Sequence, residues 1–266
     1  MIITLNKQNY FLYIDKILCI LQNKYEKCLY LWADLQHYGP FSIDTNTFIQ
    51  VNNEKQITSI MLKYHNGLNL FVPENEICDF NELNKFINKI NPKIISCTKK
   101  ISVNVHLNNS TTITGYISKL EKKQEITNIG VKPNNQQIRE VSKMLCADEH
   151  YGAGFNVDEL YNQFVKRSKD NFSRNIVVLS KTNDVIAHAC TGAECKEFAV
   201  INGVVTKEEF RHRGYGFSII SELCAILQQE KKDIYLVHFT EEAGNIYKKI
   251  GFYDVEEWAK ISENLL

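Results

Sequence analysis

The amino-acid sequence predicts an α/β protein with a mixed sheet (an α+β arrangement), divided into two domains. Short apolar runs of strand length alternate with longer amphipathic segments of helical period along the chain. The chain has 266 residues, which is enough for two hydrophobic cores of ordinary size. A composition with 44% hydrophobic and 23% charged residues is typical of globular proteins.

In the first half of the chain, two short signals are the most specific. Asn66-Gly67 between apolar runs predicts a tight hairpin turn, and Asn91-Pro92 predicts the end of a helix. A polar connector places the boundary near residue 115, so the predicted domains are 1–115 and 116–266. The predicted elements of the first domain are a helix over 10–35, strands over 48–51, 57–64 and 68–72, a helix over 80–90, strands at 94–95 and 101–107, and a connector at 108–112.

The second domain is expected to begin with a strand over residues 126–131. Two amphipathic helices, around 138–145 and 160–165, follow this strand, and a hairpin over 176–190 follows the helices. Between the two helices, residues 148–155 form an acidic, aromatic, glycine-containing segment. Such a segment suits a cationic amine, and an ordinary surface loop is the alternative.

The most informative segment is a basic, glycine-bearing turn between a strand and a helix. It reads Val204-Val205-Thr206-Lys207-Glu208-Glu209-Phe210-Arg211-His212-Arg213-Gly214-Tyr215-Gly216, and the helix after it carries one apolar stripe. Glycines allow the backbone to approach a ligand closely, and N–H groups at a helix N-terminus point at an anion. Two arginines can pair with phosphate charge. The segment therefore predicts a diphosphate site.

A second block lies further along the chain. Residues 233–240 read as a buried strand, and residues 243–252 read as a short helix closed by a glycine. Arg-x-x-Gly-x-Gly after an apolar strand, followed by Ile246-Tyr247 and Gly251-Phe252, resembles the GNAT superfamily of N-acetyltransferases. The resemblance covers residues 116–266 and implies the GNAT acyltransferase fold for this half.

The resemblance implies roles for individual residues. The end of the strand would pair with the pantetheine arm of acetyl-CoA, and the turn would bind the pyrophosphate through backbone amides. Tyr247 would protonate the departing CoA thiolate. Many relatives have an asparagine seven residues before that tyrosine, and here the position is Thr240. The implied cofactor-binding residues are Val204, Val205, Thr206, Arg211, His212, Arg213, Gly214, Tyr215, Gly216, Phe217 and Thr240.

The chemistry of acyl transfer agrees with these roles. The acyl carbonyl needs a hydrogen-bond donor where oxyanion charge develops, and a backbone N–H near Val205 can provide it. A phenol stays protonated at neutral pH, so Tyr247 suits the acid role; a tyrosine that merely packs on Phe252 is the alternative. The general base stays open. Glu194, Glu197 and His188 are candidates for this base. The alternative for the two glutamates is that they lie on a solvated strand edge, and the alternative for the histidine is that it is a buried core residue.

We therefore expect an N-acetyltransferase that moves an acetyl group from acetyl-CoA to a primary amine of a small molecule or peptide. The segments around Val204 and Tyr247 also resemble relatives of glycine N-acyltransferase, so transfer of a longer acyl group is one alternative. A non-catalytic acyl-CoA sensor is another, which Thr240 leaves open.

The first half repeats the element order helix, hairpin, helix, strand without the Arg-x-x-Gly-x-Gly turn. This order predicts a degenerate GNAT-like copy. Such a copy would close a wall of the acceptor pocket, form a homodimer surface, or simply pack against the other half.

Charge, cysteine spacing and hydropathy exclude other classes. With 31 basic and 31 acidic residues the formal net charge is zero, so no broad footprint for nucleic acid is present. Asp15 and Lys16 interrupt the only early apolar stretch, which argues against a signal peptide. No apolar run is long enough to span a membrane. We expect a cytoplasmic protein with reduced thiols and no metal site. The cysteines, none of them in a Cys-x-x-Cys pair, are Cys19, Cys28, Cys78, Cys97, Cys146, Cys190, Cys195 and Cys224.

Overall fold

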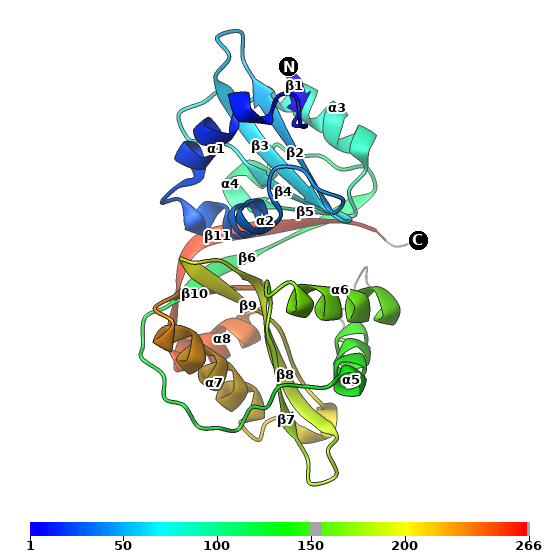
Figure 1. The fold of residues 1–266 in the computed structure, drawn as a ribbon, viewed down its shortest axis with the longest axis vertical. Coiled ribbons are helices and arrows are strands. Elements are labelled where there is room, and N and C mark those ends of the chain that lie inside the picture. The colour runs from blue at the N-terminus through cyan, green and yellow to red at the C-terminus, as the bar shows by residue number, and fades with distance from the viewer. Residues whose placement is uncertain (149–155, 265–266) are drawn as a thin grey trace. The chain divides into compact units, whose positions relative to one another are not determined.

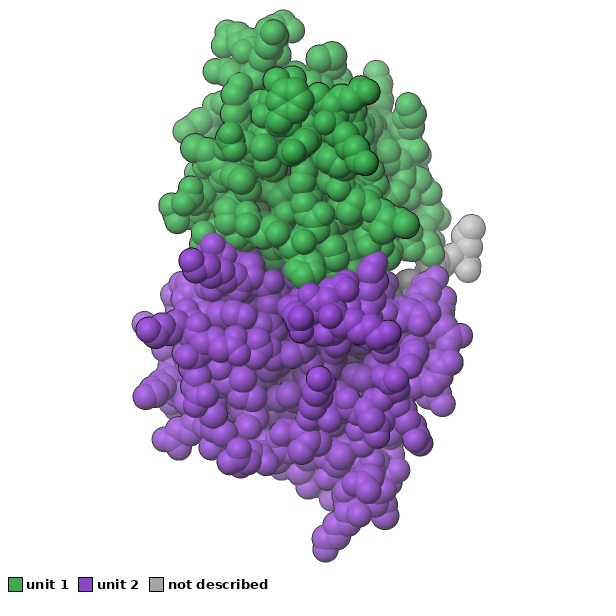
Figure 2. All heavy atoms as spheres, viewed as in Figure 1, with its two compact units in different colours: residues 1–117, 255–266 green, residues 118–254 purple. Residues whose placement is uncertain are grey.

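The computed structural model describes residues 1–148 and 156–264 (Figure 1). These residues form two compact units, coloured separately in Figure 2. The first unit contains residues 1–117 and 255–266, and the second contains residues 118–254. The predicted domains, 1–115 and 116–266, stay a prediction, and the units differ from them in one respect: residues 255–266 group with the first unit.

Each unit contains the same order of elements. Two helices precede an antiparallel meander of three strands; a crossover helix then leads to a strand that pairs in parallel with the last strand of the meander, and a final helix follows. A parallel neighbour requires such a crossover connection. The repeated order confirms the prediction that the first half has a GNAT-like fold of its own.

In the first unit, the strand order in the sheet is β1-β2-β3-β4-β5-β11-β6. The helix α3 covers one face, where Leu83 and Ile87 pack on strand residues such as Met61 and Ile95. The elements are β1 (Ile2–Thr4), α1 (Ile14–Leu21), α2 (Leu29–Tyr38), β2 (Thr45–Val51), β3 (Ile57–Tyr64), β4 (Gly67–Phe71), α3 (Phe80–Ile90), β5 (Ile94–Thr98), α4 (Lys99–Ser102) and β6 (Ser110–Leu120), with 3-10 turns at Tyr10–Leu12 and Tyr25–Lys27.

In the second unit, the strand order is β6-β10-β9-β8-β7, with apolar cores on both faces. One core lies under α7 and α8, and includes Leu223 and Ile250. The other lies under α5 and α6, and includes Val141 and Phe164. The elements are α5 (Asn135–Cys146), α6 (Val157–Lys169), β7 (Asn175–Leu179), β8 (Val185–Glu194), β9 (Phe198–Thr206), α7 (Tyr215–Gln229), β10 (Asp233–His238) and α8 (Glu241–Ile250), with a 3-10 turn at Glu208–Phe210. The last strand, β11 (Phe252–Glu263), begins at the end of this unit, and most of its residues belong to the first unit.

Several sequence-based element predictions were wrong. The alternation over residues 101–107 is not a strand, because a short helix turns the chain so that Ile101, Val105 and Leu107 all reach the core while Val103 faces solvent. The predicted connector at 108–112 is a turn only at residues 108–109, because β6 begins at Ser110. Only Val131 of the predicted strand 126–131 pairs with another strand, at Val177. The helix expected over 10–35 is divided into four short helical pieces.

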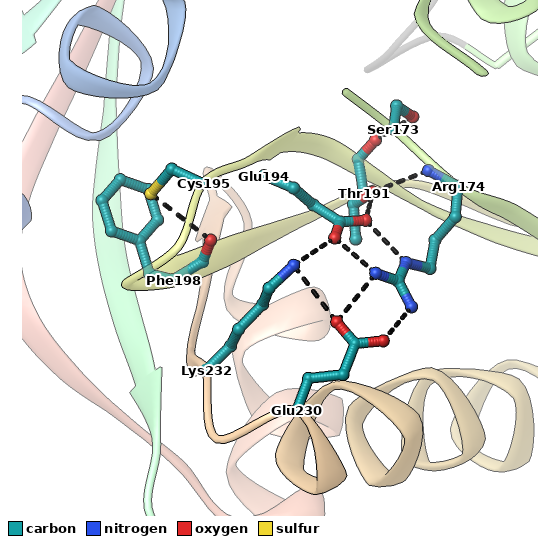
Figure 3. Close-up of polar contacts among 8 residues, drawn as sticks. All are labelled: Ser173, Arg174, Thr191, Glu194, Cys195, Phe198, Glu230 and Lys232. Carbon is teal, nitrogen blue, oxygen red and sulfur yellow. Dashed lines mark hydrogen bonds and ion pairs between the residues drawn. The ribbon is translucent and has the colours of Figure 1, made fainter. Parts of the chain in front are cut away.

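A buried ionic network connects the end of β8 to the C-terminal end of α7 (Figure 3). The carboxylate of Glu194, 6% exposed, accepts hydrogen bonds from both Nε (2.7 Å) and Nη2 (2.6 Å) of Arg174. The Nζ of Lys232 (2.7 Å) and Oγ1 of Thr191 (2.6 Å) also donate to Glu194. Glu230 in turn accepts from Arg174. Burial alone would raise the pKa of Glu194, but these donors outweigh it and lower that pKa.

His188 is the other notable buried polar group of this unit. It lies on β8 with no exposed surface, between Gly203 on β9 and Asn175 on β7. Burial lowers its pKa to about 4, and the hydrogen bond with the carbonyl of Gly203 offsets only part of that effect. His188 is therefore neutral at pH 7.

We expect Glu194→Gln to lower the free energy of unfolding by about 2–3 kcal/mol, because Arg174 and Lys232 lose the carboxylate that compensates their charge. The loss is smaller than for a fully buried pair since Arg174 is 33% exposed and Glu230 remains. Urea unfolding measures this change. The control is Glu257→Gln, which removes an exposed pair with Lys99 and should have little effect. Equal effects of the two substitutions would contradict a stabilising role for the network.

A second prediction concerns pH. Between pH about 6.5 and about 4, His188 is protonated in the unfolded chain and neutral in the folded one, so the unfolded state binds more protons. The free energy of unfolding should therefore fall as the pH is lowered through this range, by up to about 3 kcal/mol from this residue. Unfolding curves of the wild type and His188→Gln across pH 7 to 4 isolate the contribution, because all carboxylates are common to both. If the free energy of unfolding depends on pH with the same slope in both proteins, His188 makes no such contribution.

Candidate functional site

The site is built where two parallel strands diverge. Strands β9 and β10 pair from Phe198–Asp233 to Ile201–Leu236, and the pairing ends there. The rest of β9, residues 202–206, pairs with β8 on one side only. Its backbone groups on the side of β10 therefore have no strand partner, and an extended ligand can bond to them as an added strand would. The predicted pantetheine residues Val204, Val205 and Thr206 all lie on this edge.

The turn after β9 places a helix N-terminus next to this edge. Gly214, with φ of 85°, is the N-cap of α7, and no side chain caps the helix. The first intrahelical bond of this end runs from the N–H of Ser218 to the carbonyl of Gly214 (3.0 Å). The N–H groups of residues 215–217 are thus available to a ligand, and the helix dipole favours an anion there. A diphosphate matches both properties.

The basic side chains of the turn are held at its edge. Arg211 donates from Nε to the carbonyl of Thr206 (3.2 Å), and the Arg213 guanidinium lies 5.5 Å from the centre of the Phe210 ring. His212 has a φ of 60°, which turns the backbone before Gly214. The structure thus brings Arg211, His212, Arg213, Gly214, Tyr215, Gly216 and Phe217 together around the start of α7, next to the strand end.

The corresponding helix of the first unit is closed to anions. The side chain of Asp79 caps α3 and accepts from the N–H groups of Asn81 and Glu82, both at 3.0 Å. Glu82 adds a second carboxylate, which pairs with the amino group of Met1 (2.9 Å). Because Asp79 already accepts from the first N–H groups of α3 and Glu82 adds negative charge beside them, these N–H groups are not open to an anion as those of α7 are.

Helix α8 carries the predicted acid and forms the next part of the site. Tyr247 is partly buried and packs on the core beneath α7, with its ring centre 6.1 Å from that of Phe252. Burial raises the pKa of Tyr247 to about 12, so its phenol keeps its proton at neutral pH. Thr240 is the N-cap of α8, and its Oγ1 accepts from the N–H of Ala243 (3.3 Å). This capping bond accounts for a threonine at the position.

A second polar cluster near Tyr247 was not predicted from the sequence. The Nε2 atom of His238 lies 3.1 Å from Oδ1 of Asp254, which also accepts from Ser118 (2.7 Å). The His238 ring lies 5.9 Å from that of Tyr247. Burial would raise the pKa of Asp254, but hydrogen bonds from Ser118 and His238 and the charge of Lys248 lower it. No local pattern in the sequence indicates this cluster, because its members come from three different strands. In the structure Gly244 leaves room for the ring, since a Cβ there would lie 2.7 Å from Cε1 of His238.

Two of the three candidate bases are unsuited to accept a proton in this structure. Glu194 is bound by Arg174 and Lys232, and its lowered pKa makes it a poor proton acceptor. His188 is fully buried between two strands and has a pKa of about 4, so it cannot take a proton from an acceptor amine. Glu197 is exposed on the connection between β8 and β9. The predicted acceptor loop 148–155 lies almost entirely outside the described residues.

Two other kinds of feature are absent from the described residues, 1–148 and 156–264. No group of three His, Cys, Asp or Glu side chains among them is placed to hold a metal ion. None of the helices in this part of the chain combines the length and the apolar character that a membrane crossing needs.

Comparison with known proteins places this geometry in context. Residues 180–259 match a family model described as FR47-like protein. No curated protein matches the sequence. Solved structures do match nearly the whole chain. An acetyltransferase of the GNAT family from Colwellia psychrerythraea is 13% identical, with a TM-score of 0.62 over 99% of this chain and 100% of that one.

Two further structures have the same arrangement at low identity. A tandem GNAT protein from the clavulanic acid biosynthesis pathway is 10% identical, with a TM-score of 0.64 over 99% of this chain and 98% of that one. A GCN5-related N-acetyltransferase-like protein from Streptococcus suis is 13% identical, with a TM-score of 0.56 over 94% and 98% of the two chains. The diverging strands, the open helix N-terminus and these matches agree: the chain has the GNAT acetyltransferase fold, with a GNAT-like arrangement in each half.

Proposed function

We propose that the protein is an acyl-CoA-dependent N-acyltransferase, with acetyl-CoA as the donor and a primary amine of a small molecule or peptide as the acceptor. The observation that carries the proposal is the uncapped N-terminus of α7 beside the unpaired edge of β9. The first feature suits a pyrophosphate, and the second suits the amide-bearing pantetheine arm. Together they match the two parts of coenzyme A.

The reaction follows from the groups at this edge. The amine nitrogen attacks the thioester carbonyl, forming a C–N bond, and an N–H of β9 near Val205 stabilises the charge that develops on the carbonyl oxygen. The C–S bond then breaks. Tyr247 donates its proton to the departing thiolate and regains one from solvent, while the amine loses its extra proton to water.

The first unit plays a supporting part in this proposal. With Asp79 and Glu82 at the start of α3, it is not expected to bind coenzyme A, so one molecule of coenzyme should bind per chain. The free thiols of all eight cysteines favour a reducing compartment, and we include a cytoplasmic location in the proposal.

Calorimetry with CoA, followed by chromatographic detection of CoA released from acetyl-CoA, tests the function. The acceptor panel contains amino acids, polyamines, aminoglycosides and peptides with free N-termini. Binding with amine-dependent release supports the enzyme, and faster release from longer acyl-CoA esters supports the glycine N-acyltransferase-like alternative. Binding without release from any ester supports the acyl-CoA sensor. If calorimetry detects no binding of CoA, the proposal is wrong.

The anion site can be tested by adding a carboxylate to it. Gly216→Asp places a negative charge at the second residue of α7, which suits the helix dipole but repels phosphate. We expect CoA to bind at least about tenfold more weakly, corresponding to about 1.4 kcal/mol, with little loss of thermal stability. The matched control is Gly216→Asn, which brings the same crowding, since a Cβ at residue 216 lies 3.3 Å from Oγ1 of Thr206, but adds no charge. If both variants bind CoA like the wild type, the pyrophosphate lies elsewhere.

The acid role of Tyr247 has its own test. Tyr247→Phe removes only the hydroxyl, so kcat should fall by about 100-fold while the affinity for CoA is kept. Tyr253→Phe, at an exposed tyrosine of β11, is the matched control and should behave like the wild type. An unchanged kcat in Tyr247→Phe would show that the thiolate leaves without a proton from this residue.

A further inference from the structure

Strand β9 contains an extra residue at the point where it leaves β10. His188 and Cys190 are two positions apart on β8, but their partners on β9, Val205 and Asn202, are three positions apart. The extra residue forms a β-bulge, and Gly203 within it has a φ of 56°. A Cβ at this glycine would lie 2.9 Å from Sγ of Cys190, so both the backbone angle and the space require glycine.

Both backbone polar groups of Gly203 bond to side chains. Its N–H donates to Oδ1 of Asn202 (2.8 Å). Its carbonyl oxygen lies 2.6 Å from Nδ1 of His188. Because a carbonyl only accepts, Nδ1 of His188 carries a proton and donates it. The other ring nitrogen, Nε2, carries no proton in the neutral ring and lies 2.9 Å from the side-chain amide of Asn175. Since an amide oxygen cannot donate, the network is satisfied when the amide presents its Nδ2 as donor to Nε2 and its Oδ1 accepts from the hydroxyl of Ser168 (3.0 Å). The ring is thereby fixed from both sides.

The bulge begins where the two parallel strands separate. The last β9–β10 pair is Ile201–Leu236, and the bulge starts at the next residue of β9. A bulge bends its strand and changes which way the following peptide groups point. The direction of the N–H groups of Val204 and Val205 therefore depends on how the Gly203 peptide is held.

We infer that His188 is a positioning residue for acyl transfer: by donating from Nδ1 to the carbonyl of Gly203, it holds the bulge that aims the β9 N–H groups at the acyl carbonyl. This inference rests on the proposed function. His188 is fully buried and touches no substrate, so it acts through the β9 backbone. The alternative is that His188 contributes only to packing, as its contact with the Phe164 ring (5.7 Å between centres) would also suggest.

Two substitutions separate these possibilities. The side-chain nitrogen of asparagine falls near the position of Nδ1 of histidine, and that of glutamine falls near Nε2. His188→Asn can still donate to Gly203, whereas His188→Gln keeps only a group facing Asn175. We expect kcat per CoA-binding molecule to fall by about 10- to 100-fold in His188→Gln and to be largely restored in His188→Asn, with the same CoA affinity in both. Gly203→Ala should lower kcat in the same direction, and its effect should not add to that of His188→Gln.

The concentration of competent protein is taken from the stoichiometry of CoA binding, so a loss of folded molecules does not count as a loss of kcat. NMR provides a readout that needs no acceptor: the amide signals of Val204 and Val205 should differ between the CoA-bound and the acetyl-CoA-bound states in the wild type and His188→Asn, and this difference should be lost in His188→Gln. Equal kcat values and equal amide shifts in all three proteins would overturn the inference. Absence of CoA binding in the wild type would instead overturn the proposed function.

Discussion

The early end of hydrogen bonding between two parallel strands is the constraint on which the candidate site depends. After Ile201–Leu236, β9 keeps one neighbour, β8, and its other edge is left without a strand. An unpaired backbone edge costs free energy unless a partner satisfies it, and an amide-bearing ligand is such a partner. The bulge at Gly203 begins where this pairing ends, and the buried His188 and the half-buried Asn202 bond to the polar groups that the bulge removes from the ladder. The proposed pyrophosphate site lies next to this edge, because β9 leads directly into the turn before α7.

The two halves of the chain differ at one helix N-terminus, and the proposed anion site depends on this difference. Both have a strand, a connection and a helix in the same order. In the second unit the connection ends in Gly214, which has no side chain to bond the first N–H groups of α7. In the first unit Asp79 satisfies these groups of α3, and Glu82 adds charge of the same sign as phosphate. The element order is thus retained in both halves, while the chemistry of the site is present in one.

Buried polar groups in the second unit have distinct roles that their residue types do not reveal. Glu194, at the end of β8, compensates the charges of two basic side chains, Arg174 and Lys232. His188 bonds to a bulge in the neighbouring strand. His238 forms a pair with Asp254 close to Tyr247, and fits there because residue 244 is a glycine. In each case the partner comes from another strand or helix, and the partner decides whether the group is an acid, a base or a fixed structural element.

The amino-acid sequence alone was enough to predict the mixed α/β class and the basic turn at residues 211–217, because these depend on local signals: apolar period, glycine position and charge within one segment. The GNAT fold was implied by the resemblance of the motifs around residues 204–216 and 246–252 to that superfamily. The sequence also indicated that the first half repeats the element order. Tertiary structure decided what depends on contacts distant in sequence. The short helix at residues 99–102 replaced a predicted strand because the core needed Ile101, Val105 and Leu107 on one side. The candidate bases Glu194 and His188 became structural groups, and the His238–Asp254 pair emerged, because hydrogen-bond partners are set by strand pairing and packing rather than by neighbours along the chain.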